Sequence, residues 1–153
     1  MSDKEPDERT VIHYPEYWGG KKLAHPFVPP EQGKFSRSVV VGNLIFVSGC
    51  QGANDETMRV ETSDFAEQMR NALFKVKRAM EEAGSSMDNV VKTLILIKHG
   101  EDYPTMRRTE LEFYLEHAPF LVDNPPASTI ACVDLGKPEY LVEIEVTGVV
   151  SRA

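Results

Sequence analysis

Hydrophobic and polar side chains alternate along residues 140–150, YLVEIEVTGVV, with the period of a β-strand. One face would carry Val142, Ile144, Val146 and Val150, and the other Leu141, Glu143, Glu145 and Thr147. A second strand is expected at 128–133, and turn-forming residues at 134–138 separate the two. The two glutamates on one strand face either point into water or have a role in a site.

Similar patterns predict strands at 36–41, 44–48 and 90–98, and the Gly42-Asn43 pair suits a tight hairpin turn. Two segments instead have helical spacing. The first starts near Asp64, with Glu67 three residues later, and ends at Gly84. Its apolar positions are Phe65, Met69, Ala72, Leu73, Val76, Met80 and Ala83. The second helix is expected from about Pro104 to His117.

Two of the predicted strands are apolar on both faces. Leu44 and Phe46 oppose Ile45 and Val47, and Leu94 and Leu96 oppose Val91, Ile95 and Ile97. The order of elements predicts an α+β fold in which two helices cover one face of a sheet. The other apolar face then needs a second cover, and self-association provides it most economically.

Residues 1–33 form an N-terminal arm that is charged at first and then rich in proline, glycine and aromatic residues. The arm shows no clear helical or strand period, and residues 34–153 are taken as the folded domain. The arm is either a flexible tail or packs on the body or on a neighbouring subunit. Its aromatic side chains Tyr14, Tyr17, Trp18 and Phe27 favour packing, because they are costly to leave in water.

Composition narrows the class of protein. The 153 residues, 41% hydrophobic and 27% charged, suit one globular domain. No apolar run approaches the roughly 20 residues of a membrane span, and the polar amino terminus is no secretory signal, so a cytoplasmic protein without membrane contact is predicted. The net charge of −7 argues against a nucleic-acid partner. The two cysteines and four histidines lack metal-ligand spacing, so neither a metal nor another cofactor is predicted.

Four segments together carry a resemblance to a known family: GKFSRSVVVGNLIFVSG at 33–49, EEAGSSMDNVVKT at 81–93, PPAST at 125–129 and LVEIE at 141–145. They are similar to the Rid (YjgF/L-PSP) family of small trimeric proteins, best known as enamine and imine deaminases. The resemblance covers roughly residues 33–150. It implies a chorismate-mutase-like α+β subunit, a mixed sheet with two helices on one face, a trimeric barrel of such sheets, and pockets between neighbouring subunits.

The resemblance also implies a site, in which Glu143 matches the glutamate that orients or activates the attacking water. Ser48 and Gly49 keep the family's Ser-Gly pair. Ser128 stands where the deaminating members have the arginine that pairs with the substrate carboxylate. Three further positions differ from the family. Phe35 stands where the family has a tyrosine, Ile130 where it has a cysteine and Arg107 where it has an asparagine. Glu143 is therefore the predicted catalytic residue, and the predicted substrate-binding residues are Ser128, Phe35, Ser48, Gly49, Ile130 and Arg107.

Three functions follow from this pattern. The first is a hydrolytic deaminase of a small enamine or imine, with another cation or a hydroxyl in place of the arginine. The second is a non-catalytic protein that binds a small ligand in the same cleft, with Glu143 as a structural carboxylate. The third is a ribonuclease, which the acidic balance and the absence of a histidine pair disfavour. The cost of placing a carboxylate in an interface without a role favours the deaminase.

Overall fold

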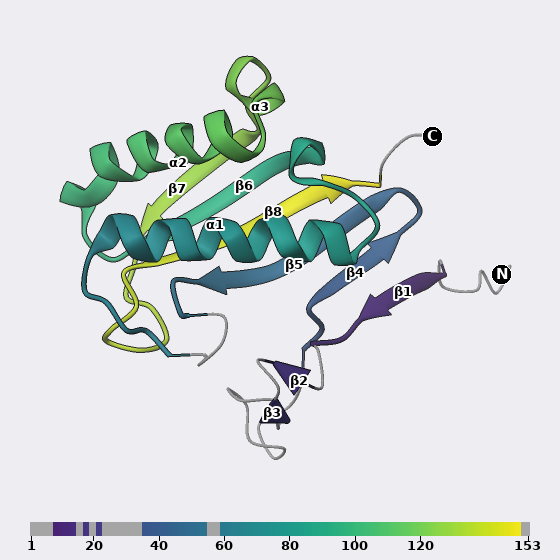
Figure 1. The fold of residues 1–153 in the computed structure, drawn as a ribbon, viewed down its shortest axis with the longest axis horizontal. Coiled ribbons are helices and arrows are strands. Elements are labelled where there is room, and N and C mark those ends of the chain that lie inside the picture. The colour runs from purple at the N-terminus through teal and green to yellow at the C-terminus, as the bar shows by residue number, and fades with distance from the viewer. Residues whose placement is uncertain (1–7, 15–16, 19–20, 23–34, 55–58, 151–153) are drawn as a thin grey trace, which may run out of the picture.

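The fold is a six-stranded mixed sheet with helices on one face, seen in a computed structural model that describes residues 8–14, 17–18, 21–22, 35–54 and 59–150 (Figure 1). The strands are β1 (Arg9–Ile12), β4 (Ser38–Val41), β5 (Leu44–Gln51), β6 (Val90–Ile97), β7 (Ala127–Cys132) and β8 (Val142–Val149). Their order in the sheet is β1-β4-β5-β8-β6-β7, and only the β6–β7 pair is parallel among these neighbours. The predicted α+β class, with one mixed sheet and its helices on one face, is confirmed; the trimeric barrel remains a prediction.

The helical elements are α1 (Phe65–Glu82), α2 (Tyr103–His117), the short α3 (Phe120–Asp123) and the 3-10 turns η2 (Met87–Asn89) and η3 (Gly100–Asp102). The predicted start of α1 is confirmed, because the Asp64 carboxylate accepts a hydrogen bond from the backbone N–H of Glu67 at 2.9 Å. Gly84 follows the helix at a φ of +80°, where glycine is favoured. The apolar stripe of α1, including Met69 and Met80, is buried in the core against the sheet.

The hairpin between β4 and β5 is confirmed, with Gly42 at a φ of +60° in the turn. The strands β7 and β8 follow one another in the chain but are not neighbours in the sheet. Instead, β6 lies between them, parallel to β7 and antiparallel to β8. The segment at 134–138 is thus part of a crossing connection rather than a hairpin turn.

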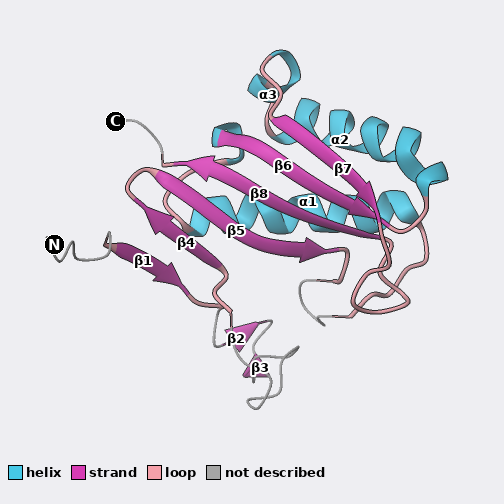
Figure 2. Cartoon of the chain, turned by 180° about the vertical axis from the view of Figure 1, so that it is seen from behind, coloured by secondary structure: helices cyan, strands magenta, loops and turns pink. Residues whose placement is uncertain are grey.

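The sheet face opposite α1 and α2 carries no helix in the described part of the chain (Figure 2). On β5 the side chains of Leu44 and Phe46 are 41% and 47% exposed, while Ile45 and Val47 are buried beneath the helices. Leu94 and Leu96 also lie on this open face, as partners of Glu145 and Glu143 in the register of β6 with β8. The two-sided apolar pattern predicted from the sequence is therefore present in one chain.

One residue of β6 departs from the predicted alternation. Val91 was expected on the same face as Ile95 and Ile97, but it is exposed while those two are buried. The reason is a register shift between Val90 and Lys92, which interrupts the alternation of faces near the start of the strand.

The N-terminal arm contains a strand that its sequence did not predict. Arg9–Ile12 forms β1, which pairs antiparallel with β4 at the edge of the sheet. A further two-stranded sheet pairs β2 (Tyr17–Trp18) with β3 (Lys21–Lys22). The side chains of Tyr17 and Trp18, and all of Phe27, lie outside the described residues. The boundary at residue 33 remains a prediction.

Candidate functional site

An irregularity in β5 places the predicted Ser-Gly pair beside Glu143. The register of β5 with β8 shifts between Val47 and Cys50, so Ser48 and Gly49 have no partners in the regular ladder. A Cβ at Gly49 would collide with the carboxylate of Glu143, whose Cδ atom lies 2.9 Å from that position. Gly49 therefore lets a carboxylate lie directly on the backbone, which is a use of glycine in irregular strands near functional sites.

Glu143 projects from β8 on the open face of the sheet and is only partly exposed. Its Oε1 atom accepts a hydrogen bond from Nε2 of Gln51, its register partner on β5, at 3.2 Å. Burial raises the pKa of the Glu143 carboxyl, and the negative charge of Glu145 raises it further, while the bond from Gln51 acts in the opposite direction. A carboxyl with a raised pKa is suited to proton transfer near neutral pH.

The N-terminal arm and the segment before β4 bring aromatic side chains to the same end of β5. The rings of Tyr14 and Phe35 meet edge to face, with centroids 5.7 Å apart. Burial raises the pKa of the Tyr14 phenol, and the nearby Cys50 and Glu143 raise it too, whereas Arg37 lowers it. Tyr14 is thus a site residue that the sequence did not identify. The only signal for it was the cost of leaving the arm's aromatic residues in water.

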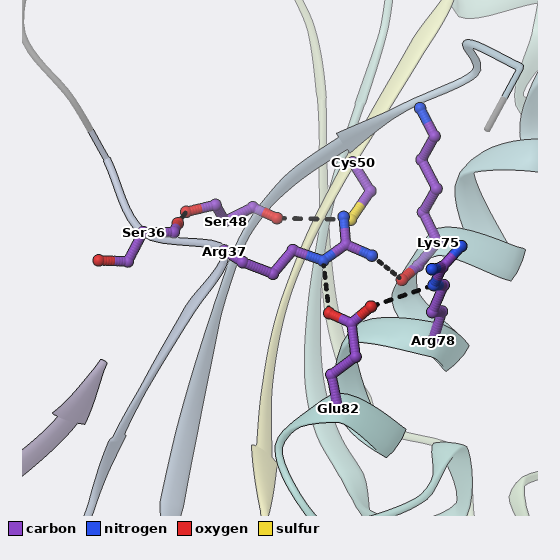
Figure 3. A network of polar contacts seen from close by, with 7 residues as sticks. All are labelled: Ser36, Arg37, Ser48, Cys50, Lys75, Arg78 and Glu82. Atoms are coloured by element: carbon purple, nitrogen blue, oxygen red, sulfur yellow. Dashed lines mark hydrogen bonds and ion pairs between the residues drawn. The ribbon is translucent and has the colours of Figure 1, made fainter. Parts of the chain in front are cut away.

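A polar network braces this end of β5 against α1 (Figure 3). Arg37, which is buried, donates to the backbone carbonyl of Lys75 at 3.3 Å and forms an ion pair with Glu82 at 3.3 Å. The hydroxyl of Ser48 donates to the carbonyl of Ser36 at 2.6 Å. Ser48 therefore ties the irregular part of β5 to the segment before β4, and Arg37 ties that segment to α1.

The raised pKa of Glu143 predicts how pH affects stability. The folded protein holds the proton of the Glu143 carboxyl more tightly than the unfolded chain does. The contribution of this protonated carboxyl to stability is therefore full at low pH and is lost as pH rises through the folded pKa. We expect the stability of Glu143→Gln relative to wild type to increase as pH rises above the ordinary glutamate pKa of 4.5. Urea unfolding at fixed protein concentration measures this difference.

Glu116→Gln is the matched control for that measurement, because the Glu116 side chain is 76% exposed on α2. Its stability is expected to follow the wild-type curve. Parallel pH curves for Glu143→Gln and wild type would show that burial does not disfavour the charged form of Glu143.

Two other predicted site residues lie together at the far edge of the sheet. Ser128, on β7, accepts hydrogen bonds from the Thr93 hydroxyl at 3.0 Å and from Nη2 of Arg107, on α2, at 3.3 Å. Arg107 also pairs with Glu110 through Nη1 at 2.9 Å. Ile130, two residues along β7, is partly buried against the core. Contact between Arg107 and Ser128 could not be foreseen from their separation of 21 residues.

The structure does not bring the predicted residues into one pocket within a single chain. Glu143 lies on the open face of β8, whereas Ser128 faces the helices with its partner Thr93, and β6 separates the two strands. Ser48, Gly49 and Glu143 form one group, close to the ring pair of Tyr14 and Phe35. The second group is Ser128 with Arg107.

Glu145 and Cys132 belong to neither group, whereas the thiol of Cys50 donates a hydrogen bond to the backbone carbonyl of Ser48 at 3.5 Å. Glu145 is exposed and lines a separate hollow of about 190 Å³ together with Lys92 and Leu94. Cys50 is buried and Cys132 is exposed. No three histidine, cysteine or acidic side chains within the described ranges are placed to hold a metal ion. No helix in the part of the chain that the structure covers is long and apolar enough to span a membrane.

Comparison with known proteins places the chain in a family. Residues 28–150 match the family model described as Endoribonuclease L-PSP. The chain is 32% identical over 123 residues to a 2-iminobutanoate/2-iminopropanoate deaminase of Dermatophagoides farinae, a match that covers 80% of this chain and 91% of that protein. It is 30% identical over 132 residues to the protein of the same name from Escherichia coli (strain K12), over 86% and 98% of the two chains.

The solved structures agree with the sequence comparisons. The crystal structure of the YjgF gene product of E. coli is similar to this chain with a TM-score of 0.68 and 32% identity, over 76% of this chain and 88% of that one. A putative endoribonuclease L-PSP from Entamoeba histolytica is similar with a TM-score of 0.71 and 25% identity, over 94% and 100% of the two chains. The chain therefore belongs to the endoribonuclease L-PSP family, also known as the Rid or YjgF family.

Proposed function

We propose that this protein is a hydrolytic deaminase of small, reactive enamines or imines, active in the cytoplasm at clefts between the subunits of a homotrimer. The observation that carries the proposal is the position of Glu143. Its carboxylate is partly buried, lies against the backbone of Gly49 and has a pKa raised by burial. The relatives named 2-iminobutanoate/2-iminopropanoate deaminase support the reaction class.

The reaction requires little beyond a positioned base and a site that holds the imine. Glu143 accepts a proton from water as the water oxygen bonds to the imine carbon, and the C=N double bond becomes a single bond. The proton then passes to the nitrogen. Glu143 then accepts the proton of the new hydroxyl group and passes it to the nitrogen. The carbon–nitrogen bond breaks, ammonia leaves as the carbon–oxygen bond becomes a carbonyl, and the carboxylate is regenerated. An enamine enters the same sequence after a proton is added to its carbon to give the imine.

A cleft between copies is supported by the separation of the two groups within one chain. The open apolar face, with Leu44, Phe46, Leu94 and Leu96, is the surface that a second copy would cover. In such an assembly, the group around Glu143 of one subunit could meet the group around Ser128 of another. The resemblance to a trimeric family implies this arrangement.

A non-catalytic ligand-binding protein is the second candidate. The observation that favours it is Ser128, at the position where the resemblance expects the arginine of the deaminating members. We do not propose a nucleic-acid substrate, because the net charge of −7 opposes binding to a phosphate backbone.

The lifetime of an imine distinguishes the two candidates. An amino-acid oxidase generates 2-iminopropanoate from alanine, and the protein is added at increasing concentration. A deaminase shortens the lifetime of the imine and releases ammonia at a rate proportional to the protein concentration. A binding protein leaves the lifetime unchanged, and that result, repeated with an imine that lacks a carboxylate, would overturn the proposal.

A further inference from the structure

Arg107 is held at the edge of β7 by three hydrogen bonds that point in different directions. Its Nε atom donates to the hydroxyl of Tyr103 at 3.3 Å, Nη1 to Glu110 at 2.9 Å and Nη2 to Ser128 at 3.3 Å. Tyr103 and Glu110 lie four residues before and three residues after Arg107, which is the spacing of neighbours on a helix surface. The guanidinium also lies 5.5 Å from the centroid of the Tyr103 ring, within the range of a cation–π contact.

This arrangement fixes the guanidinium but does not use all of its hydrogens. A guanidinium has five N–H groups. The three bonds above use three of them, which leaves two without a partner among the described residues. The Arg107 side chain is 34% exposed, so these hydrogens are accessible to a ligand. A preorganised guanidinium also loses less side-chain freedom when a ligand binds.

The neighbouring hydroxyl adds a further donor. The Ser128 oxygen already accepts bonds from Thr93 and Arg107, so both of its lone pairs are used and its own hydrogen is left to donate. Ser128 is exposed at the edge of the sheet. Arg107 and Ser128 thus present donors side by side, which is the chemistry that recognises an anion with two oxygens.

Glu110 limits the charge that this site can accept. Its side chain is only 11% exposed and its carboxylate pairs with Arg107. Burial raises the pKa of Glu110, while Arg107 and the hydrogen bond from Tyr114 lower it. When Glu110 is ionised, the pair carries no net charge, so a singly charged ligand is favoured over a phosphate with two charges.

We propose that Arg107, together with Ser128, binds the carboxylate of a small 2-oxo or 2-imino acid, with the geometry of a planar fork on two oxygens. The inference rests on the proposed function, because it assigns the charged end of the substrate of that reaction. It names Arg107 as the residue that makes amino-acid-derived imines substrates.

Equilibrium binding of pyruvate and pyruvamide tests this assignment, since the two molecules have similar shapes and only pyruvate carries a charge. Isothermal calorimetry on the assembled wild-type protein is expected to show tighter binding of pyruvate. Arg107→Gln should weaken pyruvate binding roughly tenfold to a hundredfold and leave pyruvamide nearly unchanged. Inorganic phosphate is expected to compete only weakly.

Arg108→Gln is the matched control, because it removes the same charge from the next position of α2. Within the described part of the chain, the Arg108 guanidinium donates a hydrogen bond only to the Thr105 hydroxyl. This variant should keep the wild-type preference for pyruvate. If Arg107→Gln does not fold, Arg107→Lys replaces it, because lysine keeps the charge without the planar fork. Its preference for pyruvate over pyruvamide should be weaker than that of wild type but not lost. Glu110→Gln should increase the preference, because it removes the competing negative charge.

Two results would overturn the inference: equal affinity of the wild type for pyruvate and pyruvamide, or an unchanged preference in Arg107→Gln. These measurements involve no turnover, so they separate this inference from the proposed function. A protein that hydrolyses imines without preferring the carboxylate would refute only the role of Arg107. A protein that binds pyruvate through Arg107 but hydrolyses no imine would refute the hydrolysis and keep the anion site.

Discussion

Replacement of Glu143 by glutamine is expected to abolish imine hydrolysis while ligand binding persists. Glutamine keeps the size of the side chain and can still accept a hydrogen bond from Gln51, but it cannot take a proton from water. Loss of a general base typically lowers the rate by about 10²–10⁴-fold. The measurement is kcat for ammonia release from an imine, together with the equilibrium affinity for the corresponding 2-oxo acid.

Glu145→Gln provides the matched control on the same strand face. Glu145 is exposed, and the three atoms nearest to a Cβ at Gly49 all belong to Glu143, so kcat of Glu145→Gln at the pH optimum should be close to that of wild type. Because the charge of Glu145 raises the pKa of Glu143, its removal should move the acid limb of the pH–rate profile to lower pH. If Glu143→Gln keeps full activity, the carboxylate is structural and the binding-protein candidate replaces the deaminase.

Replacement of Leu94 by aspartate is expected to break the assembly into monomers. Leu94 lies on the open face of β6, and a second copy that covers this face would bury the new carboxylate without a partner. An unpaired buried charge costs several kcal/mol, so subunit affinity should fall by at least about a hundredfold. Leu96→Asp, on the same face, should act in the same way. Sedimentation equilibrium measures both.

Leu115→Asp is the control for assembly. Leu115 lies on α2 and is 58% exposed, so the same chemical change there should leave the oligomeric state unaltered. A wild-type protein that stays monomeric at micromolar concentration would contradict the homotrimer. An aspartate at Leu94 that leaves the assembly intact would show that a different surface joins the subunits.

The elements that could be predicted are those whose signal is local. The capping pair Asp64 and Glu67 marks the start of α1, and the Gly42 turn marks the hairpin, because each depends on backbone groups only a few residues away. Features that were missed, such as β1 and the exposure of Val91, depend on distant partners. The strand β1 exists through pairing with β4, and Val91 is displaced by a register shift against β8.

By itself, the sequence determined the amphipathic pattern of each strand and helix, the two-sided apolar strands and the carboxylate of Glu143 on the less apolar face of β8. These properties follow from the alternation of side chains along a single element. Only the tertiary structure decided that Glu143 lies on the backbone of Gly49 and that Arg107 reaches Ser128. Both contacts join separate elements, and their geometry depends on strand register and helix packing, which no local pattern specifies.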